Sequence, residues 1–572
     1  TVNRKFYPAI APTQSSSYDT FVTEEWTERT GKKWTGLGGD NKMSNAANWA
    51  NNDMPEAGDD IDFTIAVPNA EIDANIDATF GKVWLGAGDL PAFTGTLSAT
   101  AVNDLTRMQT YDTATADFTF TLAAQDFAWN GGAAANWSDV NVWMNADAAA
   151  TWADNNNAIF NTANATVTLN DNVTANSLAF DAPATIGGAA TLTASSVSVA
   201  SDVTAVISAP TVGALEKTGA GALTLTENRT DVTTLTEGTL ALVGTASLDW
   251  TQLAFGTDPA KPVTLEVGPD ATIANIPNPW KVQSANGVDT VFCKQGGDWL
   301  VRDQLYLGGG ATASFQHNGG NLTVWGFLSV GEGGTGLLDI CGGTVKSTRS
   351  GTYTLIGNNR AATVVVSNSG SLVVSGSVAV GNQPGSSGTL VVADGGTVSV
   401  GGSLIFCNRN ASTSGRVDLG RGGVIAAVNA YRKNAGSATF NFDGGTFKKS
   451  SGTGDIFDAS GVDVVVSANG GTIDNNGLAI TIPCTITGVG GLTLSGAGTT
   501  TVSADQSYTG TTTVSNGTTL SVGGGVTLAG PLALEAGSTL NLVSYTHGVT
   551  PVVASALALP ESGTVALTLN GG

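Results

Sequence analysis

Charge is scarce in this sequence, and most of it is negative. Charged residues make up 12% of the chain, about half the usual share, and the formal net charge is −23. A chain this acidic is not expected to bind nucleic acid or anionic membrane surfaces. Thr, Ser, Ala, Asn and Gly take the place of charge, and these residues suit strands and turns better than helices.

Long apolar runs are also missing, although hydrophobic residues make up 41% of the chain, too many for a disordered protein. No stretch of about 18 apolar residues occurs, so the sequence predicts no transmembrane helix. The N-terminal stretch TVNRKFYPAIAPTQSSSYDT lacks the apolar core of a secretory signal peptide. The chain is therefore either intracellular or a secreted protein whose leader has already been removed.

Glycine is abundant, at 75 residues, and much of it stands in one recurring phrase. A turn-forming residue, Gly-Gly and an apolar strand recur at QHNGGNLTVW, DICGGTVKST, VADGGTVSVG, NFDGGTFKKS and SANGGTIDNN. With looser copies included, eight phrases follow one another at steps of 22 to 27 residues, about 25 on average. Asn-Gly and Asp-Gly suit corners where the backbone needs a positive φ. A second corner follows the next strand, at Gly308, Gly331, Gly357 and Gly381.

The eight phrases share a column of apolar residues two positions after the second glycine. Seven of the eight residues five positions before that glycine are apolar as well. The segments alternate with a period of two, which predicts strands rather than helical repeats. A period near 25 with fixed apolar columns is typical of a solenoid, in which such a column is stacked and buried. The predicted core column is Trp299, Leu322, Val345, Leu372, Val398, Ile425, Phe447 and Ile473.

Tryptophan is concentrated near the N-terminus, where eight of the 12 Trp precede residue 153. One segment opens at Trp34 and reaches Trp49 through a polar stretch, and a parallel segment runs from Trp129 to Trp143. The duplicated Trp residues could form a sugar-stacking platform, but we favour core filling and capping of an exposed solenoid end. Residues 1–210 are then two sandwich-like modules or, the interpretation we favour, an elaborated start of the solenoid.

We therefore predict an all-β fold, a right-handed parallel β-helix of about 25-residue coils with a Trp-rich N-terminal β region. Coils of such a fold lie about 4.8 Å apart, and right-handedness follows the usual chirality of parallel crossovers. The predicted regions are an extended N-terminal arm at 1–30, Trp-containing β modules at 31–125 and 126–210, and the parallel β-helix at 211–572.

Two stretches, 217–244 and 494–524, resemble the autotransporter-associated β-strand repeat. The second copy holds Gly496-Ala497-Gly498, then Tyr508-Thr509-Gly510, and closes with GTTL at 517–520. The first copy keeps GAG and GTL but lacks Tyr-Thr-Gly. The Trp modules resemble segments found ahead of the same repeats in large bacterial surface proteins. The resemblance implies an autotransporter-passenger-like bacterial β-solenoid, extracellular or on the outer cell surface, with its leader already removed.

Residues suited to catalysis are hard to find. The chain has two histidines, His317 and His547, and no HExxH, GxSxG, P-loop or CxxC motif. Polysaccharide lyases and hydrolases also use the β-helix, but no pair of carboxylates placed to flank one glycosidic bond is evident. We interpret the nearest candidates as a solvated face and predict that the protein is not an enzyme. Those candidates are Asp443, Lys448, Lys449, Asp455, Asp458 and Asp463.

Signals for metals and disulfides are weak. Asp59, Asp60 and Asp62 crowd on one loop and form a weak Ca²⁺ candidate, with an ordinary acidic turn as the alternative. No other cofactor is expected. The gaps between successive cysteines along the chain do not match one coil, so we predict free thiols.

Two classes of function remain open. We prefer a secreted or cell-surface structural or adhesive protein, either an adhesin or a self-assembling fibre or surface-layer subunit. The alternative is a carbohydrate-binding or polysaccharide-degrading β-helix protein. Expected partners are further copies, through the solenoid ends or the arm at 1–30, or a cell-surface polysaccharide or a host or neighbouring cell surface. A smooth lateral ladder of Thr, Ser and Asn would favour the first class, and a groove of stacked Asp, Arg or Trp the second.

Overall fold

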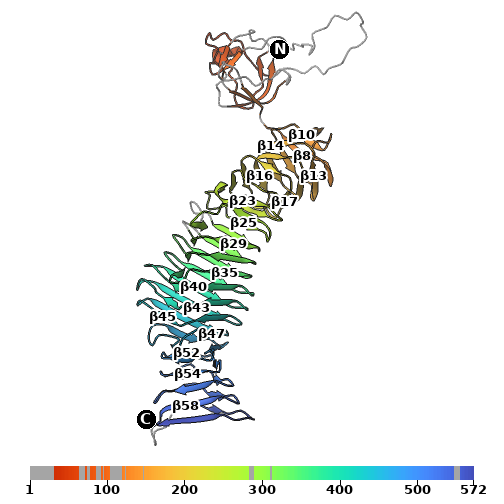
Figure 1. Ribbon diagram of the computed structural model, residues 1–572. Helices are drawn as coiled ribbons and strands as arrows, with labels where there is room; N and C mark the ends of the chain where they lie inside the picture. The colour runs from red at the N-terminus through yellow and green to blue at the C-terminus, as the bar shows by residue number, and fades with distance from the viewer. Residues whose placement is uncertain are drawn as a thin grey trace, which may run out of the picture. The chain divides into compact units, whose positions relative to one another are not determined.

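The chain is an all-β parallel solenoid. In the computed structural model 2% of the chain is helical, and stacked parallel strands form a β-solenoid of about 19 turns (Figure 1). This confirms the predicted all-β parallel solenoid, while the coil length of about 25 residues and the handedness stay predictions. The arm at 1–30 and His547 lie outside the described residues. The structure describes residues 31–63, 71–73, 78–85, 92–94, 96–102, 119–122, 124–145, 147–282, 289–308, 312–545 and 554–571.

Two compact units divide the chain. Residues 1–127 and 155–157 form the first unit, and residues 128–154 and 158–572 form the second. The first unit repeats the solenoid plan on a small scale, because its strands also pair in parallel. Its main ladder is β1 (Lys32–Lys33), β2 (Ile61–Phe63), β4 (Thr79–Leu85), β6 (Thr96–Val102) and β7 (Thr119–Leu122), and its other pair is β3 (Glu71–Asp73) with β5 (Ala92–Thr94). The 3-10 helices η1 (Ala46–Asn48) and η2 (Ala50–Asn52) lie between β1 and β2.

The first coils of the second unit have two faces. Among the described residues, face A is the longest ladder, with 16 strands, and it crosses residue 210 without a break. Residues paired between neighbouring strands of face A are close together in the sequence here. Examples are Leu225 with Leu242 and Ile186 with Ile207, so each coil is short. Its strands are β9 (Ala134–Asn136), β13 (Ala165–Leu169), β15 (Ala184–Gly188), β17 (Thr204–Ile207), β20 (Ala222–Leu225) and β22 (Gly238–Leu242).

Face D is the ladder opposite face A in these coils. It belongs to a 10-stranded sheet that opens with antiparallel pairs and then becomes parallel. Its strands are β8 (Asp126–Trp129), β10 (Trp143–Asn145), β11 (Ala148–Ala150), β12 (Asn156–Phe160), β14 (Val173–Phe180), β16 (Leu192–Val199), β18 (Thr211–Val212), β19 (Leu215–Thr218), β21 (Thr233–Leu235) and β24 (Leu253–Phe255). Three short elements, β23 (Ser247–Asp249), η5 (Trp250–Gln252) and β26 (Thr272–Ala274), mark the change to wider coils.

The middle coils have three faces. Face A continues, but most of its register partners are now farther apart in the sequence, as Leu390 is from Val417. The longer coil therefore accommodates one additional strand. The strands of face A here are β25 (Val263–Val267), β28 (Thr290–Lys294), β31 (Ala313–His317), β34 (Gly336–Ile340), β37 (Ala362–Val366), β40 (Ser387–Val392), β43 (Ser414–Gly420), β46 (Ser437–Asp443), β49 (Asp463–Val466) and β52 (Ile486–Gly488).

Faces B and C complete the middle coils. Face B begins with β29 (Asp298–Val301), β32 (Asn321–Val324), β35 (Thr344–Ser347), β38 (Ser371–Val374), β41 (Thr397–Val400), β44 (Val424–Ala427), β47 (Thr446–Lys449) and β50 (Gly471–Asp474). Face C is β27 (Trp280–Val282), β30 (Leu305–Leu307), β33 (Leu328–Val330), β36 (Tyr353–Ile356), β39 (Ser377–Val380), β42 (Leu404–Phe406) and β45 (Ala430–Arg432). Each coil thus runs from face A to face B to face C and back to face A.

The last coils return to two faces, and their register partners are again close together in the sequence, as Val514 is to Leu534. Face B continues as β53 (Leu492–Ser495), β55 (Thr512–Val514), β57 (Leu532–Leu534) and β59 (Leu557–Ala558). Face E is β48 (Gly454–Asp455), β51 (Ala479–Ile482), β54 (Thr499–Val502), β56 (Thr519–Val522), β58 (Thr539–Tyr545) and β60 (Ala566–Gly571). The two stretches at 217–244 and 494–524 both fall on two-faced coils, one at each side of the three-faced section.

Glycine is required where coils stack at a corner. Gly320 has a φ of +67°, and a Cβ added there would overlap the carbonyl oxygen of Gly297 one coil away. The recurring Gly-Gly phrase therefore marks a corner at which neighbouring backbones approach too closely for a side chain. Within the described residues, no helix is both long enough and apolar enough to cross a membrane.

Candidate functional site

The predicted core column is one continuous ladder on face B. Its eight residues form seven successive register pairs, from Trp299 with Leu322 to Phe447 with Ile473. Trp299 is 8% exposed, and the other seven side chains are at most 1% exposed. Because each residue is stacked on the next, the column excludes water and fixes the register of face B.

Each of the two Trp segments forms its own buried aromatic cluster, and the two clusters have a similar geometry. The rings of Trp34 and Trp49 are 5.1 Å apart at 84°, and those of Trp129 and Trp143 are 5.1 Å apart at 81°. In each segment the second Trp donates its indole N–H to the backbone carbonyl six residues earlier. All four side chains are at most 2% exposed. These rings fill a core, so they do not form the sugar-stacking platform that was the alternative interpretation.

The loop of the calcium candidate makes internal contacts. Asp59 accepts a hydrogen bond from the backbone N–H of Glu56 at 2.9 Å and lies 4.0 Å from the Lys32 ammonium. Asp62 lies on β2 and is 7% exposed. Across the part of the chain that the structure describes, no three His, Cys, Asp or Glu side chains are grouped to hold a metal ion. Calcium binding at Asp59, Asp60 and Asp62 stays a prediction.

Face A holds two titratable groups side by side in its interior. Lys294 and His317 are register partners, and both are fully buried. The Lys294 ammonium donates to the carbonyl oxygens of Gly297 and Gly319 at 2.7 and 2.8 Å, and His317 Nε2 lies 3.2 Å from the Gly320 carbonyl. Burial lowers the pKa of Lys294 to about 8. Burial and the neighbouring Lys294 charge lower the pKa of His317 to about 4. From inside the coil, Lys294 and His317 thus bind carbonyl groups of the Gly-Gly corners, and we call this arrangement a clamp.

The two-faced coils contain a similar clamp at Lys217. Its ammonium donates to the carbonyl oxygens of Thr218, Gly219 and Glu237 at 2.8, 2.7 and 3.0 Å, and burial lowers its pKa to about 8. Sequence reasoning missed both lysines. The sequence does contain a signal for them, because the alternation of inward and outward residues along each strand places each lysine at an inward position.

A second group that sequence reasoning missed is a buried chain of amides between faces C and A, which we call the asparagine ladder. Lys433 Nζ donates to Asn408 Oδ1 at 3.2 Å, and Asn408 Nδ2 donates to Asn382 Oδ1 at 2.7 Å. Asn382 Nδ2 donates to Asn358 Oδ1 at 2.6 Å, and Asn358 Nδ2 donates to the Glu332 carboxylate. Every amide points the same way, so the ladder starts on an ammonium and ends on a carboxylate.

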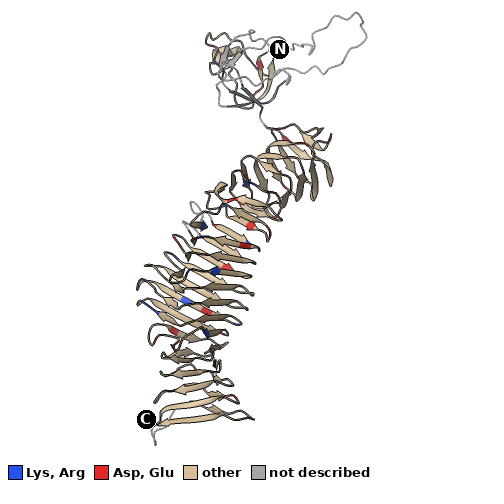
Figure 2. Cartoon of the chain, in the orientation of Figure 1, with Lys and Arg blue, Asp and Glu red and all other residues tan. Residues whose placement is uncertain are grey.

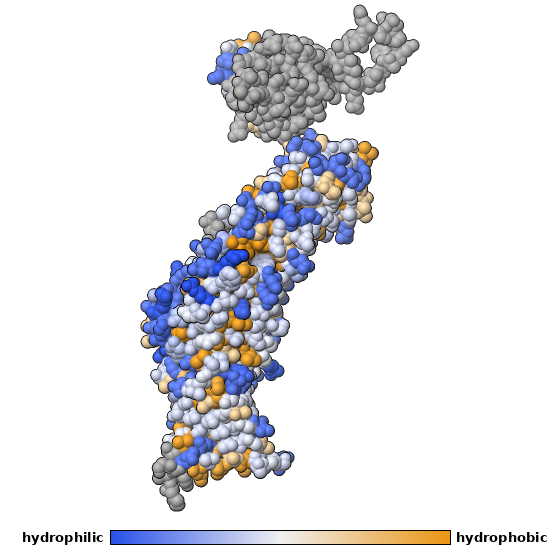
Figure 3. Space-filling view, viewed as in Figure 1, coloured by the Kyte–Doolittle hydropathy of each residue, from blue (hydrophilic) through white to orange (hydrophobic). Residues whose placement is uncertain are grey.

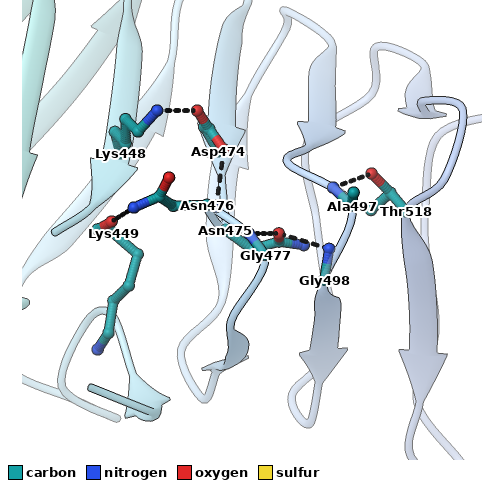
Figure 4. A network of polar contacts seen from close by, with 9 residues as sticks. All are labelled: Lys448, Lys449, Asp474, Asn475, Asn476, Gly477, Ala497, Gly498 and Thr518. Carbon is teal, nitrogen blue, oxygen red and sulfur yellow. Dashed lines mark hydrogen bonds and ion pairs between the residues drawn. The ribbon is translucent and has the colours of Figure 1, made fainter. Parts of the chain in front are cut away.

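The region considered for β-helix enzyme chemistry is held by structural contacts (Figure 4). Lys448 Nζ is 3.1 Å from an Asp474 carboxylate oxygen, and Asp474 also accepts from the backbone N–H of Asn476 at 2.7 Å. Asn476 Nδ2 donates to the Lys449 carbonyl at 3.1 Å. Asn475 Oδ1 accepts backbone N–H groups from its own coil and from the next coil. These contacts tie neighbouring coils together.

All four cysteines are free, which confirms that prediction. Burial raises the pKa of Cys293 to about 11 and that of Cys484 to about 12, so these thiols stay protonated near neutral pH. Cys407 stands in the second corner with a φ of +51°, where preceding coils carry glycine.

Face B presents a smooth outward column. Thr397 Oγ1 donates to Ser371 Oγ at 3.0 Å, which shows the contact between adjacent coils. One apolar residue, Val424, interrupts the column between Thr397 and Thr446. The remaining members are small or neutral and polar, so the surface has no groove lined by stacked acidic or aromatic residues along this column. The exposed carboxylate of Asp298 precedes this column as the register partner of Asn321, and the members after it are in order Asn321, Thr344, Ser371, Thr397, Val424, Thr446, Thr472, Thr493 and Thr513.

Face C differs, because exposed cations stand at its two corners. We call these corners and face C together the cationic face. None of its exposed cations takes part in an ion pair within the described residues, where the paired cations are Lys32, Arg416 and Lys448. Figure 3 shows strongly hydrophilic surface on the side where Figure 1 labels β45. The exposed cations are Arg302, Arg349, Arg360, Arg409 and Lys433 at the corners and Lys281 on β27.

Aromatic rings accompany three of these cations. The Arg302 guanidinium lies 5.9 Å from the Trp325 ring, and Arg349 lies 5.2 Å from the Phe327 ring. Trp325 is 49% exposed. The Lys433 ammonium lies 5.9 Å from the ring of Tyr353 on β36. Such contacts hold the cations at the corners without neutralising them.

These features define the chain as a parallel β-solenoid with a three-faced middle section. Comparisons with family models, with curated proteins and with solved structures found no significant match.

Proposed function

We propose that this chain is a structural or adhesive β-solenoid protein displayed outside a bacterial cell. The observation that carries the proposal is the smooth outward column of Thr, Ser and Asn on face B, which suits a scaffold better than a substrate groove. The resemblance of 217–244 and 494–524 to the autotransporter-associated repeat supports the extracellular location.

The stacking supplies the stiffness that such a role needs. Each inner coil is hydrogen-bonded to the coil before it and to the coil after it, and buried columns such as that of Leu372 run through successive coils. Corners are closed from within by Lys217 and by Lys294 with His317. A body built in this way resists local unfolding.

Immunogold electron microscopy of source cells tests the location, before and after the intact cells are treated with proteinase K. We expect gold particles outside the envelope and their loss after the protease. A cytoplasmic marker protein is the control, because it must survive the treatment. Labelling that lies in the cytoplasm and resists the protease would contradict the proposal.

The glycan-binding alternative has one feature in its favour, the exposed Trp325 beside Arg302 on the cationic face. An anionic glycan is therefore included as a competitor in the association experiment described below.

A further inference from the structure

Charge is distributed unevenly along the second unit. Residues 281–449 carry 13 of the 24 Lys and Arg of the chain but only 8 of its 47 Asp and Glu, a local excess of five positive charges. Residues 128–280 carry three basic and 14 acidic residues, and residues 450–572 carry no basic and seven acidic residues. A positive section thus lies between two negative ones in a chain whose net charge is −23. Lys and Arg, blue in Figure 2, appear mainly on the middle coils.

Burial removes two basic side chains from the surface of residues 128–280 and two from the surface of the positive section, where Lys294 and Lys449 are at most 1% exposed. Two of the three basic residues in 128–280, Lys217 and Arg229, are at most 1% exposed. The charged side chains at the surface of that section, which we call the acidic section, are therefore almost all negative. On the cationic face the Glu332 carboxylate accepts hydrogen bonds from Ser329, Asn358 and Asn359, and among the described residues it forms no ion pair with the exposed cations.

We propose that the cationic face of one chain docks on the acidic section of a second copy, so that chains associate side by side with a stagger. This inference rests on the proposed structural role. Unstaggered chains would place the acidic sections of both copies together, which opposes association. A staggered contact uses different surfaces on the two copies and leaves a free cationic face and a free acidic section, so it can continue into a larger array.

The length of the cationic face favours a second copy over a long polyanion. Face C has seven strands, and at about 4.8 Å per coil it spans about 30 Å. A nucleic acid or an extended glycan longer than this would also meet the acidic sections, which repel it. The acidic section of a second copy ends where its own positive section begins, so a staggered copy presents a negative surface of limited length.

Sedimentation velocity and light scattering of the complete chain test the proposal at about 20 mM and about 300 mM NaCl, because salt screens contacts between exposed charges. We expect large species at low salt and single chains at high salt. The variant R349Q/R360Q/R409Q should associate about tenfold more weakly at low salt. Its melting temperature should stay unchanged, because the three side chains are exposed and have no ion pair among the described residues.

The matched control is T323E/V373E/A426E, which reaches the same net charge through three outward positions on face B of the middle coils. This control should still associate like the unmodified chain. If R349Q/R360Q/R409Q associates as strongly as the unmodified chain, or if both variants lose association equally, the cationic face is not the docking surface.

Carbodiimide cross-linking of mixed ¹⁴N and ¹⁵N chains identifies the partner surface. We expect mixed-isotope links from Lys433 or Lys281, which both lie on the cationic face, to carboxylates within 128–280. Links confined to other sections would overturn the proposal. So would tight binding of heparin by a chain that remains single at low salt, since that outcome makes the face a glycan site. Association of a chain found inside the cell would refute the proposed location alone, and an extracellular chain that never associates would refute this inference alone.

Discussion

The two-faced coils of 128–242 and the three-faced coils of the middle section share face A but close their cross-sections differently. Where two strands suffice, the register partners on face A are close together in the sequence, as Leu225 is to Leu242. Where face C is added, they are farther apart, as Leu390 is from Val417. The extra strand brings an extra corner, and that corner carries the glycine column, the asparagine ladder and several exposed cations. The comparison teaches that the asparagine ladder and the exposed cations of the middle section belong to face C and its two corners.

The cores of the two kinds of coil can be compared at Leu372 and Val514, both on face B and both fully buried. Leu372→Asp and Val514→Asp each place an unpaired charge in a dry ladder, and we expect each to lower the free energy of unfolding by about 3–5 kcal/mol. Urea denaturation followed by circular dichroism measures this loss. A loss below about 1 kcal/mol for Val514→Asp alone would show that the two-faced core admits water.

The clamp of the middle section should make its stability depend on pH. The pKa of His317 is lowered to about 4 in the folded chain, below its ordinary value of 6.5. As the pH falls below 6.5, the unfolded chain takes up a proton that the folded chain does not accept until about pH 4. The free energy of unfolding should therefore fall by about 3 kcal/mol between these values.

Denaturation midpoints of the unmodified chain and of His317→Gln, measured across this pH range, test that dependence. The variant should lack the contribution of the histidine, while the carboxylates titrate alike in both chains. Parallel pH profiles of the two chains would contradict the expected effect.

The asparagine ladder provides a test specific to the added corner. Asn382→Leu leaves Asn358 Oδ1 and Asn408 Nδ2 without their partners in a buried site. We expect a loss of about 2–3 kcal/mol in the free energy of unfolding, because unpaired buried amides are costly. The control Ser371→Ala removes one outward hydrogen bond on face B and should cost less than about 0.5 kcal/mol. Equal losses for the two variants would mean that the ladder is not a stabilising element.

The smallest effects are expected at the second corner of the middle coils. Gly381 has a φ of +77°, and a Cβ there would press against the Ser414 carbonyl, so Gly381→Ala should cost about 1–2 kcal/mol. Cys407 occupies the equivalent corner with a φ of +51°, and Cys407→Gly should change the stability by less than about 1 kcal/mol. Thermal melting of both variants checks this difference. A larger loss for Cys407→Gly than for Gly381→Ala would show that the thiol contributes more than its backbone strain costs.

Some parts of the structure could be read from the pattern of residues, and others could not. The column from Trp299 to Ile473 was predictable because an apolar residue recurs at one offset from each Gly-Gly corner. The number of faces was not predictable from this pattern, since a coil of given length can be divided into two strands or three. The cationic face was hidden as well, because a net charge of −23 says nothing about where the cations lie.

The sequence by itself determined that the chain is a parallel β-solenoid, because glycine corners and alternating apolar strands at a regular interval leave few other ways to bury the apolar columns. Only the tertiary structure decided which polar side chains meet. Asn358, Asn382 and Asn408 stand far apart in the sequence, and they join a single ladder because three-faced coils place them at the same corner. Lys294 and His317 likewise become neighbours through the register of face A. Stacking of the coils brings residues that are one coil apart in the sequence into contact. Which residues meet depends on the register of the stacking, and all faces of a coil together set that register.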